Sequence, residues 1–204
     1  NTSNVPNCGQ NKYSWTVTYT PTSGCLPAVS DYNFINGTNA GSANPQFQFN
    51  NPGIYTISLI VISPAAACTS VAVTQTVTVK GKPVVTLPVF GDICQNQSIT
   101  PSSTTTCYID ATSTYSWTFG GGSPATSNLP NPGSVAFNTS GTRTISLGVT
   151  NECGTTTASQ TFVVNPKPTV NAVPNQTLCA GASTTAINFS GSTVPNTTYN
   201  WTNN

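Results

Sequence analysis

GTRTISLGVT at residues 141–150 repeats GIYTISLIVI at residues 53–62, and both stretches alternate apolar and polar side chains. In a strand, successive side chains point to opposite faces, so residues two apart share a face. One face of the earlier stretch carries the apolar residues Tyr55, Ile57, Leu59 and Val61. The matching face of the later stretch carries Ile145, Leu147 and Val149. This period of two predicts two strands, each with one face in a core.

The repeat extends well beyond these two strands. TQTVTVKGKPVV at 74–85 matches SQTFVVNPKPTV at 159–170, and FGDICQNQSIT at 90–100 matches PNQTLCAGAST at 174–184 in outline. The matched positions in these two pairs lie about 85 residues apart. Units of this length are too long for solenoid repeats and are typical of small β-sandwich domains arranged in a row.

The joints KGKP at 80–83 and NPKP at 165–168 set the expected domain boundaries. We predict a first β-sandwich over 1–82, a complete second one over 83–166, and the start of a third over 167–204. The first copy is expected to lack its opening strands and the third its closing ones. The first copy also carries an insertion of about 14 residues after its tryptophan, which we expect to form a longer loop around Cys25 and 31–38.

The composition is almost without charge. Five Lys and Arg, four Asp and Glu and no His make up 4% of the chain, against about 25% in ordinary domains. Thr, Ser and Asn supply the polarity and, with 16 Gly and 16 Pro, disfavour helices, so the fold class is predicted to be all-β. A net charge of +1 gives no field that would attract nucleic acid. No apolar run approaches the roughly 20 residues of a membrane span.

The three tryptophans stand in similar contexts, KYSWTVTY at 12–19, TYSWTFGGG at 114–122 and TYNWTNN at 198–204. A tyrosine two residues before a tryptophan shares its face in a strand. The residues predicted to be core aromatics are Trp15, Trp117, Trp201, Tyr13 and Tyr115. The rival interpretation is an exposed aromatic platform that stacks on sugars.

YSWTFGGGSP at 115–124, followed by NPGSVAF at 131–137 and SGTRTISLGVTNECG at 140–154, resembles the PKD family of Ig-like β-sandwiches. The resemblance implies tandem Ig-like (PKD-like) sandwich domains. Gly121 stands where the family usually has Asp, and Arg143 where it usually has Tyr. These departures leave the core pattern intact but weaken the idea of an acidic, calcium-binding turn.

A narrower resemblance rests on PNQTLCAGASTTAINFSG at 174–191, DYNFINGT at 31–38 and NPQFQFNNPGIYTISL at 44–59. These stretches are similar to the tandem repeats of giant cell-surface adhesins of Bacteroidetes, among them a gliding adhesin of Flavobacterium. The resemblance implies a non-catalytic segment of a secreted, surface-displayed filamentous adhesin that serves cell adhesion and gliding motility. It also implies export by the type IX secretion machinery and display outside the cell, associated with the outer membrane.

The partners implied are a surface polysaccharide or other cell-surface ligand, bound through the parent adhesin, and neighbouring repeats of the same chain. The alternative is a carbohydrate-binding or spacer module of a secreted polysaccharide-degrading enzyme, where PKD-like domains also occur. On either interpretation we expect no catalytic residues and no cofactor.

Seven cysteines in so polar a chain favour an oxidising compartment. In an Ig-like sandwich the B–C and F–G loops lie at the same end, which implies bonds from Cys107 to Cys153 and from Cys8 to Cys68. The rival bond from Cys94 to Cys153 would leave Cys107 free. The sequence leaves the connectivity open, including that of Cys25, Cys94 and Cys179.

The four acids are Asp31, Asp92, Asp110 and Glu152, and no two of them are close in sequence. Only Asp110 and Glu152 lie near proposed bridge cysteines, so these two carboxylates could meet at one end of the second copy. With backbone carbonyls they would form a weak calcium candidate. Two solvated loop acids are the favoured interpretation.

Overall fold

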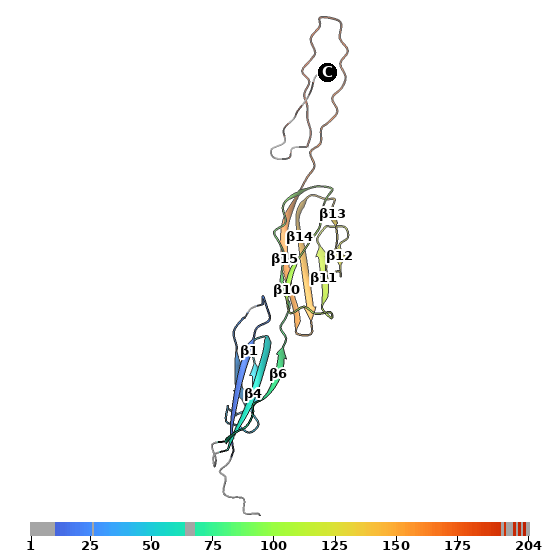
Figure 1. Cartoon of the computed structure of the whole chain (residues 1–204). Helices are drawn as coiled ribbons and strands as arrows, with labels where there is room; N and C mark the ends of the chain where they lie inside the picture. The colour runs from blue at the N-terminus through green and yellow to red at the C-terminus, as the bar shows by residue number, and fades with distance from the viewer. Residues whose placement is uncertain are drawn as a thin grey trace, which may run out of the picture. The chain divides into compact units, whose positions relative to one another are not determined.

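The computed structural model describes residues 11–25, 27–63, 68–192, 194, 198, 200 and 202, without the side chains of Cys68, Thr105 and Thr106. All regular structure in these residues is strand, from β1 to β15, and the fold is all-β, as the composition predicts (Figure 1). The chain divides into two compact units. Unit 1 comprises 1–86, 103–115 and 148–158, and unit 2 comprises 87–102, 116–147 and 159–204.

The larger sheet of the first copy is built around β4 (Gly53–Ser63). Strand β1 (Lys12–Thr20) pairs along one edge, and β5 (Cys68–Thr69) and β6 (Val73–Val79) pair along the other. All three pairings are antiparallel, and Leu59 lies opposite both Trp15 and Val73. The indole and the apolar residues of β4 therefore lie side by side in one sheet.

A second, smaller sheet comes from the stretch between β1 and β4. Strands β2 (Tyr32–Ile35) and β3 (Gln46–Phe49) pair antiparallel, with Phe34 opposite Phe47. Ring contacts join them to the larger sheet, at 4.4 Å between the centroids of Phe49 and Tyr55 and 6.3 Å between those of Trp15 and Phe47. The insertion was expected to be a loop, but part of it is a strand because its aromatic residues pack into the core.

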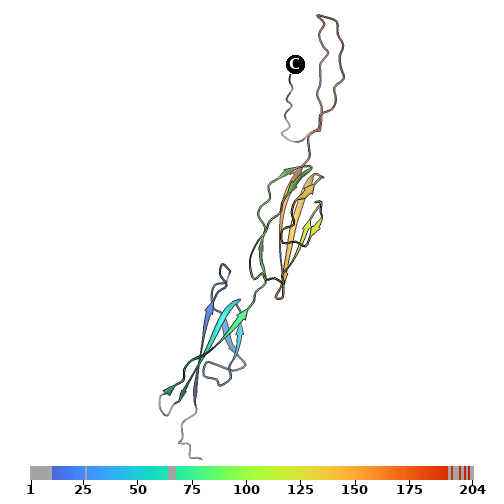
Figure 2. The same ribbon diagram turned by 45° about the vertical axis from the view of Figure 1, so that its right-hand side comes forward.

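The remaining strands lie between residues 84 and 165 (Figure 2). Five of them form a sheet in the order β12-β11-β14-β15-β8, and the others form the pairs β10-β7 and β13-β9. Their bounds are β7 (Val84–Thr86), β8 (Ile93–Cys94), β9 (Gln97–Ile99), β10 (Thr104–Cys107), β11 (Thr114–Phe119), β12 (Thr126–Ser127), β13 (Val135–Phe137), β14 (Gly141–Asn151) and β15 (Gly154–Asn165).

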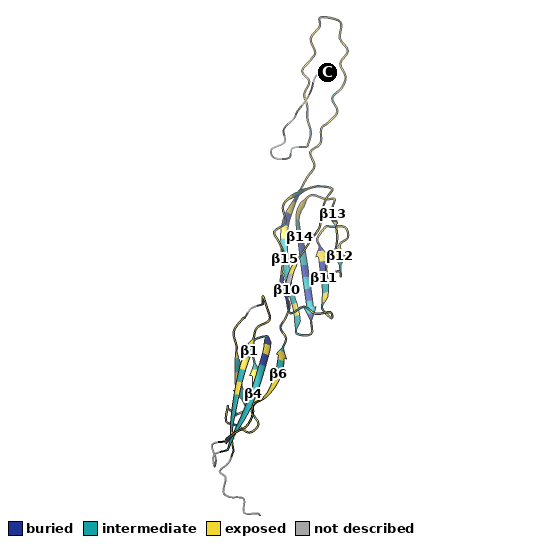
Figure 3. Cartoon of the chain, viewed as in Figure 1, coloured by how far each residue is buried: buried dark blue, intermediate teal, exposed yellow. Residues whose placement is uncertain are grey.

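The core of the second copy is fully closed. Buried residues gather on β11, β13, β14 and β15 (Figure 3). Each of the following is at most 3% exposed: Trp117, Phe119, Val135, Phe137, Ile145, Leu147, Val149, Phe162 and Val164. The indole N–H of Trp117 donates a hydrogen bond of 3.0 Å to the carbonyl of Leu129, so its one polar group is satisfied.

The core of the first copy is more open. Tyr55 is fully buried, but Ile57, Leu59 and Trp15 are only half-buried. The Trp15 indole donates to the carbonyl of Ser42 at 2.8 Å. Trp15 therefore differs from Trp117, because less protein covers it on the side away from its sheet.

The other residues predicted to be core aromatics lie as follows. Tyr13 and Tyr115 are half-buried. Trp201 lies outside the described residues.

The two indoles should contribute unequally to stability. We expect Trp117→Ala to lower the free energy of unfolding by about 3 to 5 kcal/mol, because it empties a closed core. Trp15→Ala should cost less, about 1 to 2 kcal/mol, since that side chain buries less surface. Urea denaturation followed by circular dichroism measures both values. An equal or larger cost at Trp15 would contradict the difference in burial.

Candidate functional site

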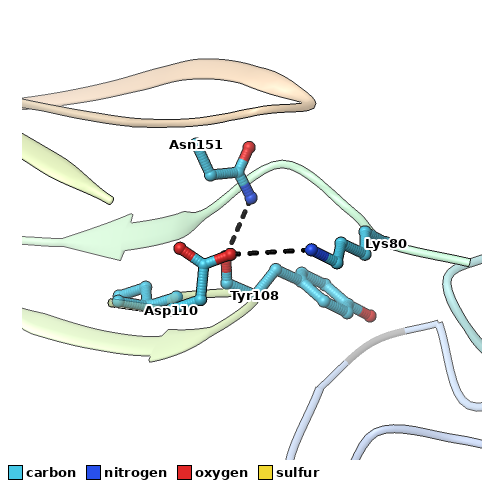
Figure 4. A pocket seen from close by; sticks show the side chains of 5 residues that line it. Lys80, Tyr108, Asp110 and Asn151 are labelled. Atoms are coloured by element: carbon cyan, nitrogen blue, oxygen red, sulfur yellow. Dashed lines mark hydrogen bonds and ion pairs between the residues drawn. The ribbon is translucent and has the colours of Figure 1, made fainter. Parts of the chain in front are cut away.

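Both ion pairs found among the described residues lie in unit 1, beside a small pocket of about 170 Å³ (Figure 4). We call its polar residues the Lys80 cluster: Lys80, Tyr108, Asp110, Asn151 and the adjoining Glu152. Strand ends position all five. Lys80 follows β6, Tyr108 and Asp110 follow β10, and Asn151 ends β14 directly before Glu152.

Asn151 is the central residue of this cluster. It is 9% exposed, and its amide nitrogen donates to the carbonyl of Gly81 at 2.7 Å and to that of Tyr108 at 2.8 Å. Its amide oxygen accepts from the backbone N–H of Cys153 at 2.8 Å. A buried amide with unpaired groups would be costly, and here each donor and the acceptor has a partner. Asn151 thus ties together the segments that contain Gly81, Tyr108 and Cys153.

Asp110 closes a tight turn. Its Oδ1 accepts from the Thr112 hydroxyl at 2.7 Å and from the Thr112 backbone N–H at 2.9 Å. These two bonds, the hydroxyl first, lower the pKa of the Asp110 carboxyl below its ordinary value. The carboxylate therefore stabilises its own turn, as the side chain does in other Asx turns.

Lys80 lies between two carboxylates. Its ammonium forms an ion pair with Glu152 and lies 3.8 Å from Oδ2 of Asp110 (Figure 4 shows the second pair). The hydrogen bond and charge of Glu152 raise the pKa of Lys80. All three side chains are exposed, with 52% exposure at Lys80, so each pair contributes little by itself.

The arrangement bears on the calcium candidate. Asp110 and Glu152 do come to one place, but the group between them is the Lys80 ammonium. A divalent ion there would face that positive charge, and the carbonyls of Gly81 and Tyr108 already accept from Asn151. Among the described residues no group of three or more His, Cys, Asp or Glu side chains is placed to hold a metal ion. The polar groups of the cluster hold backbone segments together, chiefly through the hydrogen bonds of Asn151.

An apolar contact adjoins the cluster. Gly81 leaves no space for a side chain, because a Cβ there would lie 2.7 Å from Cγ of Pro52 and 3.0 Å from the ring of Tyr108. Burial in this contact raises the pKa of the Tyr108 hydroxyl.

Tyr19 bonds the same proline. Its hydroxyl donates to the carbonyl of Pro52 at 2.8 Å. Burial, with the nearby Tyr55 and Tyr108, raises the pKa of Tyr19.

A disulfide joins Cys25 to Cys107, also within unit 1. The two cysteines are 82 residues apart in sequence, their Cα atoms are 5.5 Å apart, and each is 3% exposed. Cys25 belongs to the insertion of the first sequence copy, whereas Cys107 precedes the tryptophan strand of the second. The bond therefore crosslinks two consecutive copies.

This pairing corrects the expected one. Cys107 does not bond Cys153, because its sulfur is already bonded to that of Cys25. The rival bond of Cys94 to Cys153 is not formed either. Cys153, Cys94 and Cys179 are free thiols, the last two exposed. Cys8 lies outside the described residues, as does the side chain of Cys68, so their expected bond does too.

Four residues of this region were missed from the sequence: Cys25, Lys80, Tyr108 and Asn151. Cys25 was noticed only as part of an insertion, and Lys80 as part of a joint. Asn151 stands in a hairpin turn among many asparagines, so nothing in its pattern marks a buried amide. The signal that could have marked Lys80 and Asn151 is that each stands at the end of a predicted strand.

Residues 81–166 match the family model of the PKD domain. No curated protein matches the chain. In the described part, no helix is long and apolar enough to cross a membrane. The match supports a PKD-like, Ig-like β-sandwich at residues 81–166, and PKD domains are in general non-catalytic modules of extracellular or surface proteins.

The disulfide can be tested by peptide mapping. A peptic digest at low pH, after alkylation of free thiols, should release a linked peptide that contains Cys25 and Cys107. Replacing both by Ser should lower stability by up to about 4.5 kcal/mol, the chain-entropy value for a loop of this length. A linked peptide containing Cys107 and Cys153 would contradict the structure.

The Asp110 turn predicts a pH dependence. Because the folded pKa of Asp110 is lowered, its stabilising contribution is present above the ordinary pKa of 3.8 and is lost as pH falls through the folded value. With only four acids in the chain, this loss has little background. Carbon-13 NMR titration should show Asp110 titrating below its ordinary value, and closer to it in Thr112→Val. Identical midpoints would show that the Thr112 hydroxyl does not act on the carboxyl.

Proposed function

We propose that the chain is a non-catalytic repeat segment of a secreted, surface-displayed filamentous adhesin, and that it holds a distal adhesive region away from the cell. Its roles would be cell adhesion and gliding motility, after export by the type IX secretion machinery to the outer surface. Its partners would be neighbouring repeats and, through the parent adhesin, a surface polysaccharide or other cell-surface ligand.

The Cys25–Cys107 disulfide is the observation that carries this proposal. A covalent bond between consecutive copies is useful in a chain that transmits tension and has no evident use in a catalytic site. The Lys80 cluster supports the same role, since Asn151 bonds backbone carbonyls and Lys80 pairs with carboxylates. The disulfide and the Lys80 cluster therefore both connect segments that are far apart in the sequence.

A second candidate function rests on Trp15. This half-buried indole lines an apolar groove with Phe47, and exposed aromatic faces stack on sugars. The chain would then be a carbohydrate-binding or spacer module of a secreted polysaccharide-degrading enzyme. The first proposal is preferred because the Trp15 groove has few polar groups to orient a sugar.

Single-molecule pulling between the two ends tests the mechanical role. In the oxidised chain, residues between Cys25 and Cys107 cannot extend. Reduction should therefore lengthen the fully unfolded chain by roughly 280 Å, from the separation of 82 residues at about 3.4 Å each. The Cys25→Ser and Cys107→Ser double variant, pulled without reductant, is the matched control and should give the longer length. A chain that extends at low force without unfolding steps would overturn the proposal.

Affinity electrophoresis in gels with dissolved polysaccharides separates the two candidates. An adhesin spacer should migrate unchanged in every gel. A carbohydrate-binding module should be retarded in at least one, and Trp15→Ala should abolish that retardation while Val89→Ala, at a valine 84% exposed, should not. Retardation that depends on Trp15 would replace the first proposal by the second.

A further inference from the structure

A free thiol lies near the disulfide of unit 1. Cys107 ends β10, and Cys153 lies in the turn between β14 and β15. The amide of Asn151 bonds to both places: its nitrogen donates to the carbonyl of Tyr108, the residue after Cys107, and its oxygen accepts from the N–H of Cys153 (Figure 4 shows the bond to Tyr108). Both bonds are 2.8 Å long. A single amide group therefore separates the backbone of Cys153 from that of the residue after Cys107.

Two lysines lie near Cys153. The pKa of Lys80 is raised chiefly by Glu152 and further by Asp110 and Cys153, so these groups all lie near its ammonium. Lys82 covers the next residue, since a Cβ on Gly154 would lie 3.0 Å from Cε of Lys82 and 3.5 Å from its Nζ. A thiolate is the nucleophile that attacks disulfides, and ammonium groups nearby favour that form. The surroundings of Cys153 therefore suit an attacking sulfur.

The backbone around Cys107 departs from regular strand geometry. The register of β10 with β7 shifts between Thr105 and Cys107. Tyr108 has a φ of 59°, a left-handed conformation that is uncommon for a bulky residue. A bulge changes the direction of the side chains beside it. The direction of the Cys107 sulfur thus depends on a few irregular backbone angles, and a small change in these angles redirects it.

Cys25, the other half of the disulfide, lies on a connecting segment between β1 and β2. Cys25 itself is 3% exposed, but residues 21–24 before it and 28–30 after it are exposed. Gly24 has a φ of 74°, in the left-handed region that glycine adopts readily. Once its bond is broken, the sulfur of Cys25 can therefore turn to solvent with little rearrangement of packed residues.

We infer that Cys153 is an internal nucleophile that exchanges with the Cys25–Cys107 disulfide. After Cys153 loses its proton to water, its sulfur attacks Sγ of Cys107 and forms a Cys107–Cys153 bond. The Cys25–Cys107 bond breaks, and its electron pair leaves on the sulfur of Cys25, which takes up a proton. One disulfide and one thiol are present before and after, so no oxidant or reductant is consumed.

The exchange moves the crosslink from between two copies to within one. The sequence separation of the bonded cysteines falls from 82 to 46, and all of the closed stretch then belongs to the second copy. The first copy loses its covalent bond to the second beyond the backbone itself. The structure holds the state before exchange. This inference is independent of the adhesin proposal.

The reach of Cys153 is tested first in Cys25→Ser, which frees the sulfur of Cys107. Cys94 and Cys179, both exposed, are replaced by Ser so that they cannot compete. After oxidation by glutathione disulfide under native conditions, peptic mapping should find Cys107 linked to Cys153. Near-ultraviolet circular dichroism before oxidation verifies that the aromatic core is folded. Cys107 and Cys153 that both remain open to alkylation would overturn the inference.

The exchange itself is followed in the chain that keeps Cys25, Cys107 and Cys153, stored in acid so that it starts from the Cys25–Cys107 bond. It is then held at about pH 8.5, where an ordinary thiol is half ionised, without added thiol or oxidant. Samples are quenched in acid and alkylated. The linked peptide of Cys107 and Cys153 should rise over minutes to hours, in step with alkylation of Cys25.

Two controls show which thiol attacks. The rate should be unchanged when the protein is diluted, because the attack is intramolecular. Cys153→Ser is the matched variant and should leave Cys25 protected from alkylation. Release of Cys25 in that variant, a rate that falls on dilution, or the absence of the linked peptide after several hours would overturn the inference.

Discussion

A fully buried indole needs a partner for its N–H, and the bond from Trp117 to the carbonyl of Leu129 supplies one. That bond allows the largest side chain of the core to be fully buried, with the ring of Phe119 stacked on it at 5.9 Å between centroids. The glycines after the tryptophan follow from the same constraint. A Cβ on Gly122 would lie 2.7 Å from Val135 and 3.0 Å from Phe137, so the turn beyond β11 must carry no side chain there.

The same sandwich plan has a different outcome in the first copy. Trp15 also bonds a backbone carbonyl, and it lies opposite Leu59, yet it stays half-buried. The aromatic rings of β3 supply part of its cover, since Phe47 contacts Trp15 and Phe49 contacts Tyr55. The burial of an indole thus depends on strands distant in sequence as much as on its own strand.

Much of the fold could be predicted because it depends on local alternation. The period of two at 141–150 is enough to place Ile145, Leu147 and Val149 on one face, and low charge with many Gly, Pro and Thr is enough for an all-β class. The bond of Cys25 to Cys107 could not be predicted, because it depends on how a connecting segment places residues of two copies. Asn151 was hidden for a similar reason: its partners, the carbonyls of Gly81 and Tyr108, belong to segments far away in sequence.

Outside the Lys80 cluster, side-chain hydrogen bonds among the described residues are mostly between neutral groups. Thr150 bonds Thr155, Asn171 bonds Ser190, and Gln176 bonds the backbone of Thr185. Dissolved ions screen charges over about 8 Å at physiological ionic strength but leave such dipolar bonds almost unaffected. Because few of these bonds depend on charge, the fold should keep its shape from dilute fresh water to brine.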